Sequence, residues 1–150
     1  MYQFIEFPDL KDNEIKLIVK GYDEPDLDKG YKPRYIFSIV LVETNEDVGE
    51  VYFVVDTSVR QYLRGHISYG VTPEYRGHNY ALKACLLIKN VALAHGFSRV
   101  FIGANHDNIA SIKTIEKLGA VPITKDDVPE GETLIKLQEE KTDMFVWNIA

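Results

Sequence analysis

Residues 66–81 read HISYGVTPEYRGHNYA and combine the signals of a buried strand, a tight loop and the start of a helix. The strand is predicted over 67–71, where Gly70 in the interior indicates a bulge or a close backbone approach. Pro73 ends this strand. From 76 to 81, small residues and residues that tolerate a positive φ recur as a helical pattern begins. Such a loop turns backbone N–H groups toward one point at the positive end of a helix, so it predicts an anion site, and the expected anion is a pyrophosphate.

The residues after this loop predict a helix, a strand and a second helix. Apolar residues recur at three- and four-residue steps over 79–95, and Gly96 follows as an end signal, which predicts a helix with one buried stripe. Residues 99–104 contain a continuous apolar run, which is typical of a strand buried on both faces. Strand, helix and strand at this spacing indicate a parallel, right-handed crossover. Asn108 is then expected to cap a short helix that Gly119 closes.

Alternating apolar and polar residues predict further strands on both sides of this unit. The expected strands are residues 14–22, 35–43, 48–56, 120–124 and 144–149, with a hairpin turn at 44–47 between the second and the third. The expected loops are the acidic segment 23–30, residues 57–65 and residues 125–131, while 133–140 fits either a strand or a helix. A single domain over 1–150 is expected from this length and apolar content.

Composition and charge narrow the classes of partner. The net charge is −6 and no Lys/Arg cluster is present, so neither nucleic acid nor an anionic membrane is expected as a partner. The single cysteine, Cys85, excludes an internal disulfide and a cysteine-only zinc site, and no metal is expected. No apolar run approaches the length of about 20 residues that spans a bilayer. The first residues also lack signal-peptide architecture, so a cytoplasmic protein is expected.

Two motifs in this chain resemble those of the Gcn5-related N-acetyltransferase (GNAT) superfamily. The first signature is Arg/Gln-x-x-Gly-x-Gly/Ala, usually seen as Tyr-Arg-Gly-x-Gly-x-Gly/Ala after a strand ending in Val-x-Pro. The matching residues are Val71, Pro73, Tyr75, Arg76, Gly77 and Ala81. Asn79 stands where the second glycine is usual, and asparagine tolerates left-handed backbone better than other non-glycine residues. The second motif is NHDNIAS at 105–111 followed by EKLGA at 116–120. The resemblance covers roughly residues 48–122.

This resemblance implies a fold and an activity. The implied fold is α/β, with a mixed, mostly antiparallel central sheet, a splayed parallel pair of strands and flanking helices. The family normally has two helices in the region of residues 23–34, which is too short for them here, so a reduced N-terminal helical region is expected. The implied activity is transfer of an acetyl group from acetyl-coenzyme A to a primary amine. The expected acceptor is a small molecule or a peptide, and a homodimer is left open.

The resemblance also implies a set of cofactor-binding residues. They are Tyr69, Gly70, Val71, Arg76, Gly77, His78, Asn79, Tyr80, Ala81, Asn105, Asn108 and Ser111. In the family the strands separate at the central strand, so its backbone groups bind the pantetheine arm and the thioester carbonyl. The N–H of Val71 would then stabilise the oxyanion. Asn105 matches a pantetheine-binding position, and for Asn108 a role in binding and a role as a plain helix cap weigh equally.

The proposed chemistry requires a base, because the amine arrives protonated. Glu50, on the strand next to the central one, alternates with apolar neighbours, and His66 titrates near neutrality. The alternative for each residue is a solvated side chain at the edge of the sheet that takes no part in catalysis. The family commonly protonates the departing thiolate with a tyrosine four residues before the glycine of the short helix, and that position is Ile115 here. Either Tyr80 substitutes for it or the thiolate leaves unassisted.

Two other classes of function stay open. The first is a non-catalytic acyl-coenzyme A binding or regulatory module, which is suggested by Ile115 and the short N-terminal region. The second is a structural domain that binds no coenzyme A. A dinucleotide fold is disfavoured because Gly-x-Gly-x-x-Gly is absent, and a nucleotide phosphate loop because no Walker lysine follows the glycine. If the chain is an enzyme, direct transfer is expected, because no cysteine lies near the cofactor loop.

Overall fold

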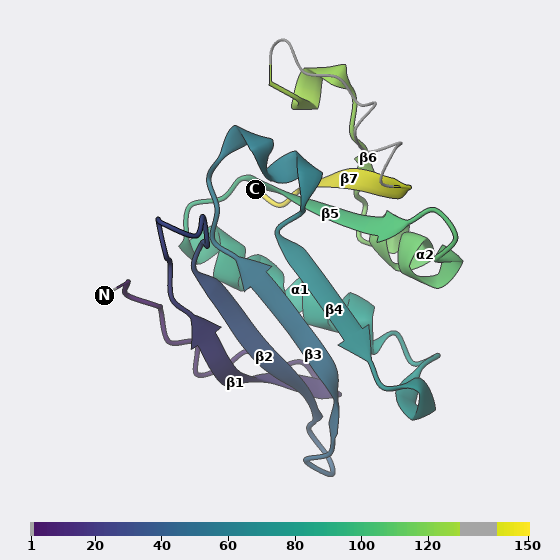
Figure 1. Cartoon of the computed structure of the whole chain (residues 1–150). Coiled ribbons are helices and arrows are strands. Elements are labelled where there is room, and N and C mark those ends of the chain that lie inside the picture. Colours follow the sequence, from purple (N-terminus) through teal and green to yellow (C-terminus); the bar gives the residue numbers. More distant parts are fainter. Residues whose placement is uncertain (1, 130–140) are drawn as a thin grey trace.

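A computed structural model describes residues 2–129 and 141–150 of the chain, and Figure 1 shows its course. The strands are β1 (Ile15–Asp23), β2 (Arg34–Leu41), β3 (Asp47–Val54), β4 (Ile67–Val71), β5 (Arg99–Asn105), β6 (Val121–Pro122) and β7 (Thr142–Asn148). The α-helices are α1 (Tyr80–Ala94) and α2 (Ile109–Lys117), and short 3-10 helices occur at η1 (Val59–Leu63), η2 (Pro73–Tyr75) and η3 (Lys125–Asp127). Among the described residues, no helix has both the length and the apolar character needed to cross a membrane.

The strands form one seven-stranded sheet in the order β1-β2-β3-β4-β5-β7-β6. The pair β4 and β5 is parallel, and the other pairs among the described strands are antiparallel. The parallel pair is in register only at Ile67 and Ile102, near the start of β4. Beyond this point the two strands diverge, as Figure 1 shows. The mixed sheet with a splayed parallel pair, predicted from the sequence, is therefore confirmed.

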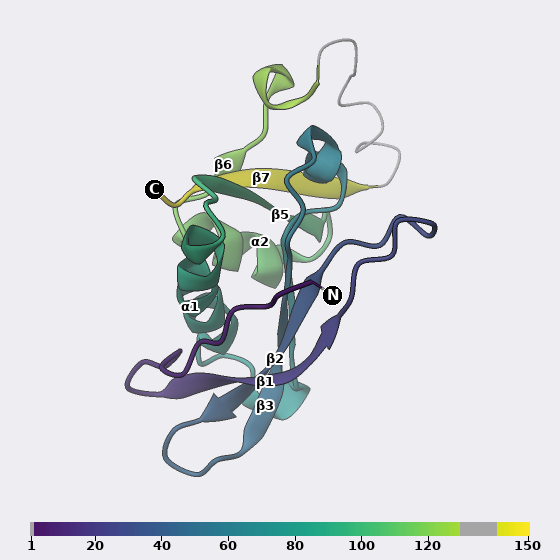
Figure 2. The ribbon, with the colours of Figure 1, turned by 90° about the vertical axis from the view of Figure 1, so that its left-hand side faces the viewer.

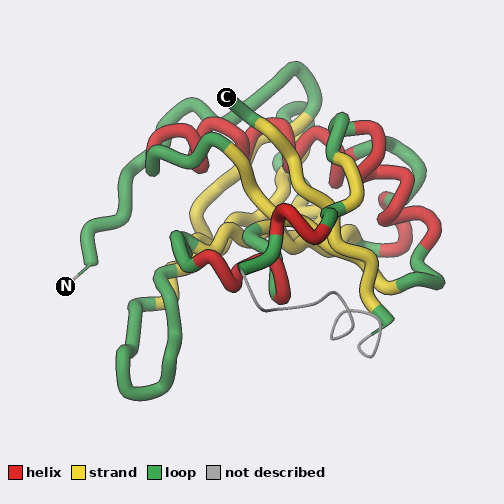
Figure 3. Tube along the Cα trace, turned by 90° about the horizontal axis from the view of Figure 1, so that it is seen from above, coloured by secondary structure: helices red, strands yellow, loops and turns green. Residues whose placement is uncertain are grey.

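Both α-helices cover the same face of the sheet, as Figures 2 and 3 show. The strands bury alternate side chains under these helices, including Tyr35, Phe37, Val51 and Phe53, each at most 1% exposed. On α1 the stripe that faces the sheet includes Ala84, Cys85, Ile88, Val91 and Ala92, all fully buried. The segment between β1 and β2 contains no helix, so the predicted reduction of the N-terminal helical region is confirmed. Within residues 2–129 and 141–150, no α-helix covers the opposite, open face of the sheet (Figures 2 and 3).

The close approach predicted at Gly70 is present, but the bulge is not in β4. The register of β4 with β3 runs without a shift from Gly49–Val71 to Phe53–Ile67. Register shifts lie instead between β1 and β2, at Val19 and Gly21, and between β2 and β3, where Val40 pairs with Asp47 and Ile39 with Gly49. A Cβ atom on Gly49 would lie 2.3 Å from the carbonyl oxygen of Gly70, whereas one on Gly70 would meet nothing within 4 Å. The crowding therefore requires glycine at position 49.

Three further expectations differ from the structure in detail. Residues 57–65 and 125–131 were expected to be loops, but they contain η1 and η3. Short 3-10 helices carry no 3.6-residue period in the sequence, which explains why the pattern missed them. The strand expected over 120–124 is reduced to Val121–Pro122. The ambiguous segment 133–140 lies outside the described residues.

Candidate functional site

The loop before α1 adopts the left-handed backbone that its sequence indicates. Gly77 has φ +90° and Asn79 has φ +63° with ψ +25°, so Asn79 adopts the conformation for which glycine is usual. Asn79 is also the N-cap residue of α1. The first turn of α1 contains no acidic residue to neutralise its unpaired N–H groups and positive dipole. This end of the helix is therefore suited to an anion.

The exposed edge of β4 faces the gap that the diverging strands create. The carbonyl of His66 accepts from the N–H of Val54 (2.8 Å), and the N–H of Thr72 donates to the carbonyl of Val48 (2.9 Å). Because backbone groups alternate in direction along a strand, even-numbered residues of β4 bond to β3 and odd-numbered residues point away from it. The N–H and C=O groups of Tyr69 and Val71 therefore face the gap, while those of Gly70 face β3. Arg76 Nε donates to the carbonyl of Val71 (3.1 Å), which ties the loop to this edge.

A pocket of about 460 Å³ lies between this edge, the loop and α2. Its lining residues are Tyr69, Gly70, Val71, Tyr75, Arg76, Gly77, Asn79, Tyr80, Ala81, Asn108, Ala110, Ser111, Lys113, Thr114 and Lys117. The structure thus brings together the predicted cofactor-binding residues except His78 and Asn105. His78 is exposed and stacks on Tyr80 with ring centroids 5.2 Å apart. Asn105 is exposed at the end of β5.

The pocket is cationic although the chain as a whole carries a net charge of −6. Its lining contains Arg76, Lys113 and Lys117 but no Asp or Glu. Lys117 Nζ donates to Asn79 Oδ1 (3.2 Å), so α2 also contacts the loop. Sequence reasoning missed both lysines. Their four-residue spacing on one face of the helix after the Asn108 cap was the available signal.

We expect these lysines to contribute to anion binding. The double variant Lys113→Glu/Lys117→Glu should lower affinity for coenzyme A roughly 100-fold or more at low salt, because charge-assisted bonds to phosphate are replaced by repulsion. Lys11→Glu/Lys125→Glu makes the same change in net charge at exposed residues outside the pocket and should have little effect. Calorimetric titration at two salt concentrations measures both. Equal losses in the two double variants would contradict a local role for Lys113 and Lys117.

The inner wall of the pocket carries a pair of hydroxyl groups. Tyr69 Oη lies 2.7 Å from Ser111 Oγ, which joins β4 to α2. Burial raises the pKa of Tyr69, so its hydroxyl is protonated at neutral pH. Asn108 Oδ1 accepts from the N–H of Ser111 (3.2 Å), so the predicted helix cap is confirmed. Ile115, one turn further along α2, is fully buried.

Glu50 lies on the open face of the sheet, on the side of β3 opposite the buried Val51 and Phe53. Its carboxylate pairs with Lys20 and accepts a hydrogen bond from the Tyr52 hydroxyl. These two contacts, Lys20 first, lower the pKa of Glu50, so the group is ionised at neutral pH. Glu50 lines a cavity of about 610 Å³ that shares residues 69–71 of β4 with the cationic pocket. A carboxylate is thus present on the open face of the sheet, in a cavity that reaches β4.

His66 lies at the junction of β4 and β5 and does not line the cationic pocket. It is 4% exposed, and both nitrogens of its ring form hydrogen bonds. The N–H of Phe101 donates to His66 Nδ1 (2.9 Å), so Nε2 carries the proton and donates to the carbonyl of Asp56 (2.8 Å). Burial lowers the pKa of His66, which keeps the ring neutral. The imidazole therefore joins the two parallel strands where they start to separate.

This role predicts a dependence of stability on pH. Above its ordinary pKa of about 6.5 the His66 ring is neutral in both states. As the pH falls below that value, the unfolded chain binds a proton that the folded chain resists, so the free energy of unfolding decreases. His66→Gln should lower stability by about 2 kcal/mol, because Phe101 N–H and the Asp56 carbonyl lose their partner. It should also reduce the loss of stability on acidification.

Urea denaturation at about pH 7.5 and about pH 5.5 measures both effects, and exposed His78→Gln is the matched control. A loss of stability on acidification that stays the same in His66→Gln would contradict this role for His66.

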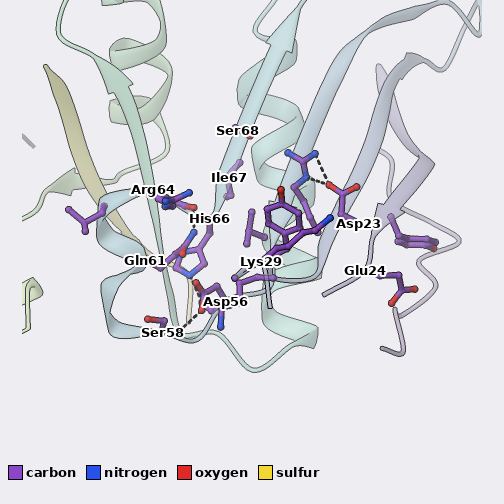
Figure 4. Close-up of a pocket in the computed structure, with 18 residues that line it drawn as sticks. Asp23, Glu24, Lys29, Asp56, Ser58, Gln61, Arg64, His66, Ile67 and Ser68 are labelled. Atoms are coloured by element: carbon purple, nitrogen blue, oxygen red, sulfur yellow. Dashed lines mark hydrogen bonds and ion pairs between the residues drawn. The ribbon is translucent and has the colours of Figure 1, made fainter. Parts of the chain in front are cut away.

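A larger cavity, about 1060 Å³, lies at the other end of β4. Figure 4 shows Asp23, Glu24 and Lys29 on one side of it and Gln61, Arg64 and His66 on the other. Its first side comes from the end of β1 and the loop that follows, in place of the absent helices. Ser68 lines both this cavity and the one beside Glu50. Three cavities therefore follow one another along β4.

Comparison with known proteins agrees with this arrangement. The family model described as an acetyltransferase (GNAT) domain matches residues 5–121, which is more than half of the chain. No curated protein is similar enough to count as a match.

Solved structures share the fold at low sequence identity. An acetyltransferase from Agrobacterium tumefaciens has a TM-score of 0.59 at 14% identity, with 77% of this chain and 61% of that chain covered. A GNAT-family acetyltransferase from Bacillus anthracis has a TM-score of 0.56 at 19% identity, with 76% and 66% covered. A ribosomal-protein-S5-alanine acetyltransferase from Vibrio fischeri has a TM-score of 0.54 at 18% identity, with 77% and 61% covered. The chain therefore spans less than two thirds of the length of these proteins. From the match over residues 5–121, the chain belongs to the GNAT acetyltransferase family, whose members are acyltransferases.

Proposed function

We propose that residues 1–150 act as one N-acetyltransferase domain that transfers an acetyl group from acetyl-coenzyme A to a primary amine. The observation that carries this proposal is the cationic pocket, which places an anion-binding helix end beside the exposed edge of β4. An acyl donor with a phosphorylated tail and an extended amide-containing arm fits both features. Membership of the GNAT family supports the choice of acetyl-coenzyme A as the donor.

The parts of the donor match the parts of the pocket. The pyrophosphate would accept from the N–H groups of the loop 76–81 and the first turn of α1. Arg76, Lys113 and Lys117 supply positive charge for its phosphates. The arm would lie along the exposed backbone of Tyr69 and Val71. The Val71 N–H is then available to stabilise the oxyanion that forms when the amine attacks.

Glu50 is the base that we propose, acting directly or through water. It borders the cavity that shares residues 69–71 with the donor pocket, and its lowered pKa keeps the carboxylate ionised. A carboxylate there also attracts a cationic amine. His66 is the weaker candidate because Phe101 N–H occupies Nδ1 and the Asp56 carbonyl holds the Nε2 proton.

The amine would approach over the open face of the sheet. The large cavity at the start of β4 shares the lining residue Ser68 with the cavity at Glu50. Together the two cavities give room for an acceptor with an extended chain. The cavity lining carries both charges, including Asp23, Glu24, Lys29 and Arg64. The Vibrio fischeri protein named above is a ribosomal-protein-S5-alanine acetyltransferase, so peptide α-amines join polyamines and aminoglycosides as acceptors to test. A homodimer stays a prediction.

Direct transfer is supported by the state of the sole cysteine. Cys85 is fully buried on the inner face of α1, and burial raises the pKa of its thiol to about 12. A thiol that is inaccessible and protonated is a poor nucleophile. The acetyl group is therefore expected to pass to the amine without a cysteine thioester on the protein.

The competing function is a catalytically silent module that binds acyl-coenzyme A, which the buried Ile115 favours because it offers no proton to a leaving thiolate. A panel of spermidine, kanamycin and an alanine-starting peptide separates the two readings. The enzyme should release coenzyme A thiol in step with an acetylated amine detected by mass spectrometry. Binding of coenzyme A without turnover of any amine in the panel would favour the silent module.

A further inference from the structure

Two walls of the donor pocket meet through side-chain hydroxyls. Tyr69 reaches from β4 to α2, where its Oη lies 2.7 Å from Ser111 Oγ. Both residues line the pocket, and the Tyr69 ring packs against the main hydrophobic core. The phenol is thus fixed in position while its oxygen stays at the pocket wall. The proposed donor-binding function does not otherwise use this hydroxyl.

The helix next to it provides no acid at the position of Ile115. Ser111 and Ile115 are four residues apart, so they lie on the same face of α2 in consecutive turns. Ile115 is fully buried and lies outside the pocket lining. Tyr69 brings a hydroxyl to this face from the opposite wall. An acid for the leaving group is therefore available from β4.

We propose that the Tyr69 hydroxyl donates the proton that the departing sulfur of coenzyme A takes up, while Ser111 holds the hydroxyl in place. This inference rests on the proposed acetyl transfer. The amine nitrogen forms a bond to the carbonyl carbon, the C–S bond breaks, and the sulfur keeps the bonding electrons. The proton moves from Tyr69 Oη to the sulfur, and the phenolate regains a proton that the amine nitrogen releases through water.

The surroundings of Tyr69 suit this role. Burial raises its pKa, so the hydroxyl is protonated before the reaction. The charged groups that line the same pocket are Arg76, Lys113 and Lys117, so no Asp or Glu of the lining accepts the hydroxyl proton in place of the sulfur. Tyr80 is the other tyrosine nearby, but it is the first residue of α1 and stacks on His78. Its ring therefore lies at the end of the pocket where phosphates are expected.

The first test needs no amine and uses coenzyme A itself. The ultraviolet absorbance of the thiolate reports the pKa of the thiol of bound coenzyme A. A hydroxyl that donates to the sulfur stabilises the thiolate, so this pKa should be lower in the wild-type protein than in Tyr69→Phe by about one unit or more. Tyr2→Phe removes a tyrosine hydroxyl that contacts His95 outside the pocket, so it is the matched control and should behave as wild type. The same thiol pKa in wild type and Tyr69→Phe would overturn the inference.

The second test measures turnover with the best amine of the panel. Tyr69→Phe should lower kcat about 100-fold while affinity for coenzyme A stays unchanged. The loss should be larger with the oxygen-ester analogue of acetyl-coenzyme A, because an alkoxide needs the proton more than a thiolate does. Equal losses with both donors would indicate a structural role and overturn the inference, as would a dominant loss in Tyr80→Phe.

Two further observations distinguish a loss of folding from a loss of function. Ser111→Ala leaves the Tyr69 ring intact and should change the thiol pKa and kcat in the same direction by a smaller amount, so it replaces Tyr69→Phe if that variant unfolds. A wild-type protein that binds no coenzyme A, or turns over no amine, overturns the proposed function and this inference together. Turnover that is unaffected in Tyr69→Phe overturns this inference alone.

Discussion

Gly77→Pro is expected to abolish coenzyme A binding, whereas Arg76→Ala should only weaken it. Gly77 has φ +90°, and proline fixes φ near about −65°, so the loop must reorganise and its N–H groups lose their common direction. Crowding is not the reason, because a Cβ on Gly77 would meet nothing within 4 Å. Arg76 supplies one of three positive charges, so its loss leaves the backbone site intact. Calorimetric titration with coenzyme A measures both variants.

Asn79→Gly is the matched control for this experiment. Asn79 already has a left-handed backbone, which glycine adopts with less strain, so the loop should keep its shape. The variant loses only an exposed hydrogen bond from Lys117, and exposed contacts of this kind contribute little. Affinity should therefore stay the same or increase. Full binding by Gly77→Pro would refute the loop as the donor site, and a large loss in Asn79→Gly would show that the asparagine side chain itself binds the donor.

Glu50→Gln is expected to lower the rate of acetyl transfer by about 100-fold or more with donor affinity unchanged. Glutamine keeps the shape of the side chain and removes both the negative charge and the ability to take a proton. Steady-state kinetics with the best amine of the panel, together with calorimetry for the donor, separates the two quantities. Normal turnover by Glu50→Gln would make Glu50 an ordinary surface carboxylate and leave proton removal to solvent or to His66.

The pairing of Glu50 with Lys20 gives a second, independent measurement. Lys20 is the main cause of the low pKa of Glu50, so Lys20→Met should raise that pKa. If the ionised carboxylate is the base, the acid side of the pH profile of kcat/KM should move to higher pH in Lys20→Met. Lys16→Met changes a lysine of the same strand that bonds to Asn45 instead and should leave the profile in place. The same pH profile in Lys20→Met and wild type would show that the protonation of Glu50 does not control the rate.

Much of the fold could be predicted because its signals are local. The turn from strand to helix at residues 76–81 requires positive φ, and the residue types of Gly77 and Asn79 indicate this in the sequence. The apolar run at 99–104 and the stripe on α1 are likewise set by neighbouring residues. The close approach at Gly70 was indicated, but not that its partner is Gly49, because the two glycines come from different strands. A single strand does not show which of two facing glycines needs to lack a side chain.

The candidate site was predictable where its members lie in one motif. The contribution of α2 was missed, since Lys113 and Lys117 join the pocket only because β5 diverges from β4 and carries α2 to the loop. For the same reason, the contact between Tyr69 and Ser111 is a product of the tertiary structure. His66 is a candidate base by its residue type, and only the fold shows that it is buried and hydrogen-bonded to two backbone groups. The exposure of a side chain and its hydrogen-bond partners decide such roles, and both depend on the whole fold.

A single-turnover experiment with acetyl-coenzyme A that carries a deuterated acetyl group tests direct transfer to an amine most directly. Mass spectrometry would follow the label on the donor, on the amine and on the intact protein at successive times. The label should move to the amine nitrogen in step with the release of coenzyme A, and the protein should stay unlabelled throughout. A label that stays on the donor with every amine, although the donor is bound, would contradict the proposed acetyltransferase, and a transient label on the protein would contradict direct transfer.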